Sequence, residues 1–139
     1  MGVRASHAFP NKIGELRRMS EWLQRVAADS GLDSDTAWQA ELCLNEAAAN
    51  IILYGHDDGS PHEIQIDVEP MVSGLQITIA DDGQPFNPLE APPPPSVQSL
   101  EEAPVGGLGI HLIRSFANDV RYRREHHRNV LVLTFAPRQ

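Results

Sequence analysis

Two short segments of alternating apolar residues constrain the fold of this chain more than any other feature. Residues 62–69 and 75–80 carry apolar side chains at every second position, namely Ile64, Ile66 and Val68, and Leu75, Ile77 and Ile79. Because successive side chains of a strand point to opposite faces, each segment is predicted to be a strand with one buried face. Ser73-Gly74 between them is a typical turn sequence. The sequence therefore predicts a β-hairpin over 62–81. The apolar face of this hairpin must be buried against other helices or strands.

Helical patterns before and after this hairpin can supply the cover. Residues 11–29 have apolar residues at helical spacing, and Gly31 is expected to stop that helix. A second helix is predicted from Asp33 or Ser34, either of which can cap it, to about Tyr54, where Gly55 closes it. A third helix is predicted from Gly106 to about Phe116.

Three further strands are predicted, over residues 3–9, 119–125 and 129–136. The element order is then β-α-α-β-β-loop-α-β-β within one domain spanning 1–139. This order predicts an α/β fold, a two-layer α/β sandwich with a mixed, mostly antiparallel sheet and helices on one face. The loop, residues 84–105, has no period and contains a proline run. Loops of this length are uncommon in compact domains unless they are functional or disordered.

The charge distribution excludes some functions. The net charge of −8 argues against nucleic acid as the main partner. No lysine or arginine lies between Arg25 and Arg114, a stretch that holds most of the 19 acidic residues. An anionic ligand bound there would need a metal ion, backbone amides or a cation from elsewhere in the chain. The single cysteine, Cys43, the absence of an apolar leader and the absence of a long apolar run predict a cytoplasmic protein without a membrane span.

The first motif that can carry chemistry is Glu46-Ala-Ala-Ala-Asn50, in the second predicted helix. The i, i+4 spacing places the carboxylate and the amide on one helix face, about 5–6 Å apart at Cβ. A carboxylate can take a proton from a hydroxyl, and an amide oxygen is a suitable magnesium ligand. Alone, the motif is more typical of two solvated side chains on an amphipathic helix, because Glu and Asn at this spacing are common.

Two glycine-containing motifs follow. Asp81-Asp82-Gly83 ends the apolar strand 75–80, so that Asp81 can accept a hydrogen bond from an amine while Gly83 lets a flat ring approach. Gly106-Gly107-Leu108-Gly109-Ile110 opens the third helix, whose unpaired amides suit phosphates. A plain turn and a flexible hinge are the alternatives. Neither a P-loop nor a Rossmann fingerprint is present, since the only lysine is Lys12 and no strand leads directly into these glycines.

Taken together, and in this order along the chain, the motifs resemble the GHKL ATPase superfamily, which includes histidine-kinase catalytic domains, gyrase-type ATPases and anti-sigma-factor kinases. Residues 45–56 resemble its N box, residues 79–83 its first glycine box and residues 106–113 its second. The short length, the lack of a phospho-acceptor dimerisation helix and the sequence Asn-Glu-Ala-Ala-Ala-Asn are most similar to the RsbW type of anti-sigma serine kinase. The resemblance extends from about residue 5 to residue 136.

The resemblance implies a role for each matching residue. Glu46 would be the general base that activates a serine hydroxyl, and Asn50 would bind magnesium. Asp81 would receive the adenine amine, with Gly83 beside the base. The segment Gly106, Gly107, Leu108, Gly109 and Ile110 would contact ATP, with Gly107 and Gly109 flanking the phosphates.

The resemblance also implies the partners. Residues 84–105 would form the ATP lid. The protein substrate would be a serine of a STAS-type anti-anti-sigma protein, the other partner would be a sigma factor, and a homodimer is possible.

The chain differs from this family in two places, and it leaves two other functions open. Pro104-Val105 stands where such kinases often carry a basic residue, and Arg128-Asn129-Val130 where the family often has Gly-Thr. One alternative is a partner-binding module of the same fold in which nucleotide is structural or absent. The other is an α/β domain whose motifs are coincidental.

Overall fold

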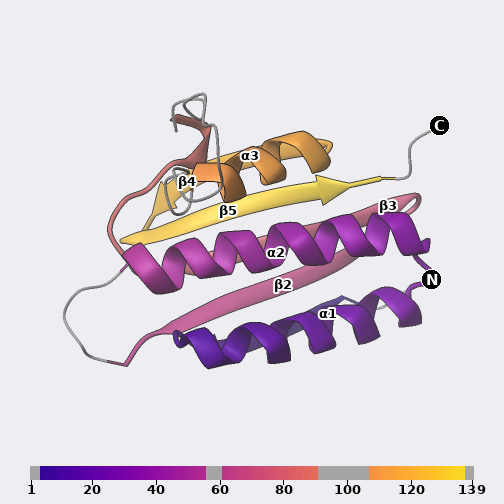
Figure 1. The fold of residues 1–139 in the computed structure, drawn as a ribbon, viewed down its shortest axis with the longest axis horizontal. Coiled ribbons are helices and arrows are strands. Elements are labelled where there is room, and N and C mark those ends of the chain that lie inside the picture. The colour runs from indigo at the N-terminus through magenta and orange to yellow at the C-terminus, as the bar shows by residue number, and fades with distance from the viewer. Residues whose placement is uncertain (1–3, 56–60, 91–106, 137–139) are drawn as a thin grey trace, which may run out of the picture.

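A computed structural model describes residues 4–55, 61–90 and 107–136, and it confirms the predicted order of elements (Figure 1). The strands are β1 (Ala5–Pro10), β2 (Glu63–Met71), β3 (Gly74–Asp81), β4 (Asp119–Glu125) and β5 (Arg128–Phe135). The helices are α1 (Leu16–Asp29), α2 (Ser34–Tyr54) and α3 (Gly107–Phe116), with short 3-10 turns η1 (Ile13–Glu15) and η2 (Pro88–Glu90).

The strands form one sheet in the order β1-β2-β3-β5-β4. The hairpin predicted over 62–81 is the β2–β3 pair, which turns at Val72 and Ser73 between the paired residues Met71 and Gly74. A mixed, mostly antiparallel sheet was expected, and all four pairings among the described residues are antiparallel. The chain leaves β3, returns through α3 to the sheet edge as β4, and turns back as β5, which therefore lies antiparallel to β3.

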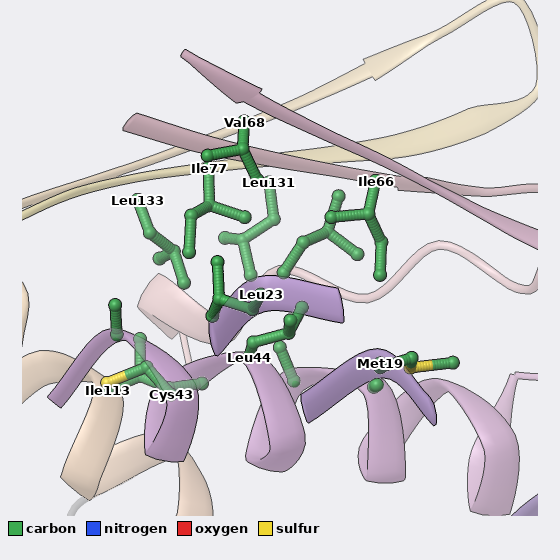
Figure 2. Packing of buried hydrophobic residues seen from close by; sticks show 14 of the residues in the cluster. Met19, Leu23, Cys43, Leu44, Ile66, Val68, Ile77, Ile113, Leu131 and Leu133 are labelled. Atoms are coloured by element: carbon green, nitrogen blue, oxygen red, sulfur yellow. The ribbon is translucent and has the colours of Figure 1, made fainter. Parts of the chain in front are cut away.

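The core lies between the apolar face of the sheet and the helix layer. Figure 2 shows side chains from the strands, among them Val68, Ile77 and Leu133, directed toward Leu23 and Leu44 of the helices. Each of these five side chains is at most 1% exposed. Complete burial of one such side chain stabilises a fold by about 1.5–3 kcal/mol. The alternation that predicted the hairpin thus marks the face on which the helices pack.

The helix boundaries follow local signals, with two differences from the prediction. Asp33 is the N-cap of α2, because its Oδ2 accepts hydrogen bonds from Thr36 N at 3.0 Å and Thr36 Oγ1 at 2.9 Å. The expected helix over 11–29 begins instead with the 3-10 turn η1 and becomes α-helical at Leu16. Gly31 ends this region with φ +72°, which glycine adopts without strain.

The other difference lies in the predicted loop. Its first residues contain η2, and Pro88 of this turn is buried. The rest of the loop, residues 91–105, lies outside the described residues, as does Gly106. Among the residues described, no helix combines the length and apolar character that a membrane crossing requires.

Candidate functional site

A pocket of about 170 Å³ opens between α2, α3 and the ends of the central strands. Its walls are mostly apolar, and its polar groups come from Asn50, Asp81, Gln84 and Asn129. The other lining residues are Ala47, Ile51, Gly55, Ile79, Pro85, Phe86, Pro88, Ile110, Ile113, Tyr122 and Leu131. An apolar cavity with a few convergent polar groups is the usual form of a small-molecule site.

Asp81 provides the carboxylate of this pocket. It is the last residue of β3, it is 3% exposed, and it lines the cavity. Its Oδ2 accepts hydrogen bonds from Gly83 N at 2.9 Å and from Asn129 Nδ2 at 3.3 Å. Asp81 is therefore held in place by its own turn and by a neighbouring strand.

Gly83 occupies a position with no room for a side chain. A Cβ at this residue would lie 2.7 Å from Gly55 O and 2.8 Å from Asp81 Oδ2. The next residue, Gln84, donates its backbone N–H to Gly55 O at 3.0 Å. The turn after β3 is thus packed directly against the end of α2, and the two motifs that the sequence analysis treated separately meet here.

Asn129 connects three of the elements that surround the pocket. Its Nδ2 donates to Asp81 Oδ2 and also to Gln84 O at 2.8 Å. Its Oδ1 accepts from Phe86 N at 3.2 Å and from Tyr122 Oη at 2.6 Å. Sequence reasoning noted Asn129 only as a departure from a family pattern and missed Tyr122 entirely. The register explains this, because Asn129 is the cross-strand partner of Asp81, 48 residues away along the chain.

A cation from the C-terminal part of the chain reaches the edge of the pocket. Arg124 of β4 donates from Nη1 to Gly83 O at 2.7 Å. The stretch between Arg25 and Arg114 contains no lysine or arginine, so this guanidinium comes from outside that stretch, as one of the three expected sources of positive charge would. The sheet order places it there, since Arg124 is paired with Asn129.

Glu46 and Asn50 lie one turn apart on α2, and both are half-buried. Asn50 lines the pocket, whereas Glu46 is absent from the described residues that line it. Glu46 lies close to Cys43. Burial raises the pKa of the Cys43 thiol to about 12, and the negative charge of Glu46 adds to this effect.

The glycine segment is only partly described. Gly107, Leu108 and Gly109 form the first described turn of α3, and Gly106 lies outside the described residues. Ile110 is buried and lines the pocket together with Ile113. The first turn of α3 is therefore followed immediately by Ile110, which lines the pocket.

The described residues contain no group of three or more His, Cys, Asp or Glu side chains that could hold a metal ion by themselves. Magnesium does not require such a group, because it commonly takes one or two protein oxygens together with phosphate oxygens and water. The amide of Asn50, on the pocket wall, has the right donor chemistry for this kind of binding.

Comparison with known proteins is consistent with this geometry. The family described as "Histidine kinase-like ATPase domain" matches residues 9–135. The serine/threonine-protein kinase BtrW of Bordetella bronchiseptica is 31% identical over 113 residues, which cover 81% of this chain and 80% of BtrW. The serine-protein kinase RsbW of Oceanobacillus iheyensis is 25% identical over 123 residues, covering 86% of this chain and 76% of RsbW.

Solved structures show the same fold. A Mycobacterium tuberculosis protein with RsbU and RsbW domains superposes with a TM-score of 0.67 at 13% identity, covering 96% of this chain and 32% of that protein. The histidine kinase domain of a blue-light activated kinase from Erythrobacter litoralis gives a TM-score of 0.53 at 14% identity, covering 92% of this chain and 61% of that domain.

Proposed function

This chain belongs to the histidine kinase-like ATPase domain family, and from this premise we propose its function. The protein binds ATP in the pocket that contains Asp81 and transfers the γ-phosphoryl group of ATP to a serine of another protein. The observation that carries the proposal is the buried Asp81 carboxylate in an apolar pocket beside Gly83, where any side chain would be excluded. Such a carboxylate can accept a hydrogen bond from the exocyclic amine of a flat base.

The size of the pocket supports this assignment. Its volume of about 170 Å³ is below the ~300–1,000 Å³ of pockets that hold a complete drug-sized ligand. It suits a single heterocyclic base, with sugar and phosphates extending beyond it. The phosphates would then meet the segment Gly106, Gly107, Leu108, Gly109 and Ile110, where the start of α3 offers unpaired amides.

In this proposal Asn50 would hold magnesium together with the phosphates, and a bound metal would supply positive charge to offset theirs. Glu46, one turn from Asn50, takes the proton of the serine hydroxyl. The serine oxygen forms a bond to the γ-phosphorus, the bond from that phosphorus to the β,γ-bridging oxygen breaks, and ADP leaves. Positioning and charge stabilisation by these groups are the main protein contributions to such a transfer.

The similarity to BtrW, named as a serine/threonine-protein kinase, and to RsbW, named as a serine-protein kinase, supports a proposal for the biological substrate. We propose that the acceptor is a serine of a STAS-type anti-anti-sigma protein and that the alternative partner is a sigma factor, with both interactions in the cytoplasm. Residues 84–105 would act as the lid over ATP.

A thermal-shift titration with ATP, with and without magnesium, tests the nucleotide site. Ligand at 100 times its dissociation constant should stabilise the fold by about 2.7 kcal/mol. Asp81→Asn replaces the carboxylate with a nearly isosteric amide and should reduce the shift, since loss of a charge-assisted hydrogen bond typically costs ~1.5–3 kcal/mol. Absence of any shift in the wild-type protein would rule out the proposed function.

One observation favours a second candidate, a partner-binding module with the same fold and a nucleotide that is not turned over. Glu46 is outside the set of described residues that line the pocket, and Pro104-Val105 replaces a basic residue at the second glycine box. ATP binding without transfer to any STAS protein of the same genome would support this candidate over the kinase.

A further inference from the structure

The solvent side of α2 carries little charge for a helix at the surface of a domain. Figure 1 shows this helix between α1 and α3 in the helix layer. Its 21 residues include three acidic side chains, Asp35, Glu41 and Glu46, and no lysine or arginine. Two large apolar side chains of the helix, Trp38 and Leu53, are 57% and 51% exposed. Because the solvent side of a packed helix is normally polar, this face has the composition of an interaction surface.

Trp38 is the largest exposed side chain of this face, and it is held in place. Its indole ring lies 5.8 Å from the ring of Phe116, at the end of α3, with an interplanar angle of 75°. Phe116 in turn packs against the hydrophobic core. This edge-to-face contact orients Trp38 while more than half of its surface stays exposed. Aromatic side chains of this kind are the usual anchors of protein interfaces, because little conformational freedom is lost when they bind.

Trp38 lies on the same side of α2 as the proposed general base. Trp38, Leu42 and Glu46 are spaced four residues apart, so they follow one another along one helix face. Eight residues of helix separate Trp38 from Glu46, which is about 12 Å along the axis. Glu46 is outside the described residues that line the nucleotide pocket, whereas Asn50 lines it. A serine hydroxyl would therefore reach Glu46 from the solvent side of α2, and the protein that carries this serine would cover Leu42 and Trp38.

We propose that Trp38 is a specificity-determining residue that anchors the acceptor protein on this face of α2, by entering an apolar hollow of the acceptor about 12 Å from its serine. This inference rests on the proposed function and adds to it the surface that selects the acceptor. Trp38 is outside the described residues that line the pocket, so it acts on the acceptor and not on ATP.

The charges of α2 favour a different protein, rather than a second copy of this chain, as the occupant of this face. Asp35, Glu41 and Glu46 make the helix acidic, and it contains no basic residue. Two copies packed through this face would bring like charges together, which is unfavourable at an interface. A second copy seated there would also cover Glu46 and block its access to a serine. The partner that fits has an apolar hollow with a basic rim.

The test measures phosphoryl transfer from labelled ATP to the purified STAS-type proteins encoded in the same genome, with the full chain as the enzyme. Steady-state kinetics are then determined with the protein that is phosphorylated. Trp38→Ala should raise the KM for this acceptor by about tenfold or more, as expected for the loss of an interface anchor. The kcat should stay within about twofold, because binding that is lost equally from the ground state and the transition state changes KM alone.

Three further measurements separate an anchor from a structural role. The affinity for ADP should be unchanged in Trp38→Ala, because Trp38 is outside the described pocket lining. Trp38→Tyr keeps a large aromatic ring and should bring KM most of the way back to the wild-type value. Val72→Ala removes a fully exposed apolar side chain from the turn between β2 and β3 and should leave KM unchanged.

The outcomes distinguish this inference from the proposed function. If the wild type phosphorylates none of the STAS-type proteins, the proposed kinase function fails and the inference fails with it. If transfer occurs and a folded Trp38→Ala variant keeps KM within about twofold of the wild type, only the role of Trp38 is overturned. A parallel loss of ADP affinity would also overturn this role, because it would show that Trp38 supports the nucleotide site instead.

A second variant keeps the test decisive if Trp38→Ala does not unfold cooperatively. Trp38→Gln introduces a neutral residue of high helix propensity whose methylene groups can still cover Phe116 but which cannot fill an apolar hollow. A rise in KM of about tenfold in this variant would support the inference, and an unchanged KM would overturn it. Sedimentation tests the other occupant: a wild-type dimer that dissociates on substitution of Trp38, with KM unchanged, would show that a second copy covers this face.

Discussion

Gly83 and Gly55 pack backbone against backbone, so that a Cβ on Gly83 would lie 2.7 Å from the carbonyl oxygen of Gly55 and 3.0 Å from its Cα. These residues come from different motifs, the turn after β3 and the end of α2. Their contact, with the hydrogen bond from Gln84 N to Gly55 O, joins the turn after β3 to the helix that carries Glu46 and Asn50. The two halves of the proposed site therefore depend on each other's position.

Gly83→Ala should reduce both stability and nucleotide affinity. The added methyl group meets backbone atoms that cannot rotate away, and overpacking of this kind typically costs about 1–3 kcal/mol. Thermal denaturation and ADP titration measure the two effects. Gly14→Ala is the matched control, because no atom lies within 4 Å of its added Cβ, and its stability should change by no more than about 0.5 kcal/mol. Equal melting temperatures for the two variants would contradict the close contact.

Glu46→Gln should retain ADP and magnesium affinity within a few-fold and lose phosphoryl transfer. The amide is nearly isosteric but cannot accept a proton, and general-base contributions are typically ~10²–10⁴-fold. Asn50→Ala should instead lower binding and transfer together, because it removes the proposed magnesium ligand from the pocket wall. Single-turnover assays with labelled ATP and candidate STAS proteins measure transfer. Unchanged transfer in Glu46→Gln would exclude Glu46 as the base.

Arg124→Gln should weaken ADP binding by about tenfold or more, since loss of one hydrogen bond to a charged group typically costs ~1.5–3 kcal/mol. The variant removes both the contact to Gly83 O and a positive charge at the pocket edge. Arg121→Gln provides the control, since it removes the same charge from the same strand but breaks an exposed pair with Asp119. If both variants bound ADP as the wild type does, Arg124 would have no part in the site.

The capping interaction of Asp33 should make stability depend on acid pH. The side-chain hydrogen bond from Thr36, and then the backbone one, lower the pKa of Asp33 below its ordinary value of 3.8. A lowered folded-state pKa gives stability that is present above the unfolded value and is lost as pH falls through the folded one. The Asp33→Asn variant keeps a capping oxygen that cannot titrate, so the melting-temperature advantage of the wild type over this variant should shrink between pH 6 and pH 3. A constant difference would show that the cap charge is irrelevant.

The Cys43 thiol should be unreactive in the native protein at pH 8. Burial raises its pKa to about 12, with a further contribution from the charge of Glu46, so almost none of it is thiolate at that pH. A disulfide reagent should label it only as fast as the protein unfolds, and immediately in denaturant. Fast labelling of the native protein that does not change with stabilising conditions would contradict the packing of α2 against α3.

The sequence by itself determined the elements of this protein, because the signals for them are local. Alternation over residues 62–80 predicted the β2–β3 hairpin, and the helical spacing and cap at Asp33 predicted α2. Asp81 and Gly83 could be selected as candidate site residues for the same reason. A carboxylate followed two residues later by a glycine at a strand end is a local pattern that can be recognised in the sequence.

Only the tertiary structure decided which residues surround Asp81 and Gly83. Asn129 and Arg124 reach the turn at residues 81–86 from 41 or more positions away, through a strand order that no local pattern encodes. Asn129 is an ordinary polar residue in sequence, and it lines the pocket because β5 pairs with β3 in the register that sets it opposite Asp81. Hydrogen bonds depend on distance in space, and that distance is determined by the pairing of strands that are remote along the chain.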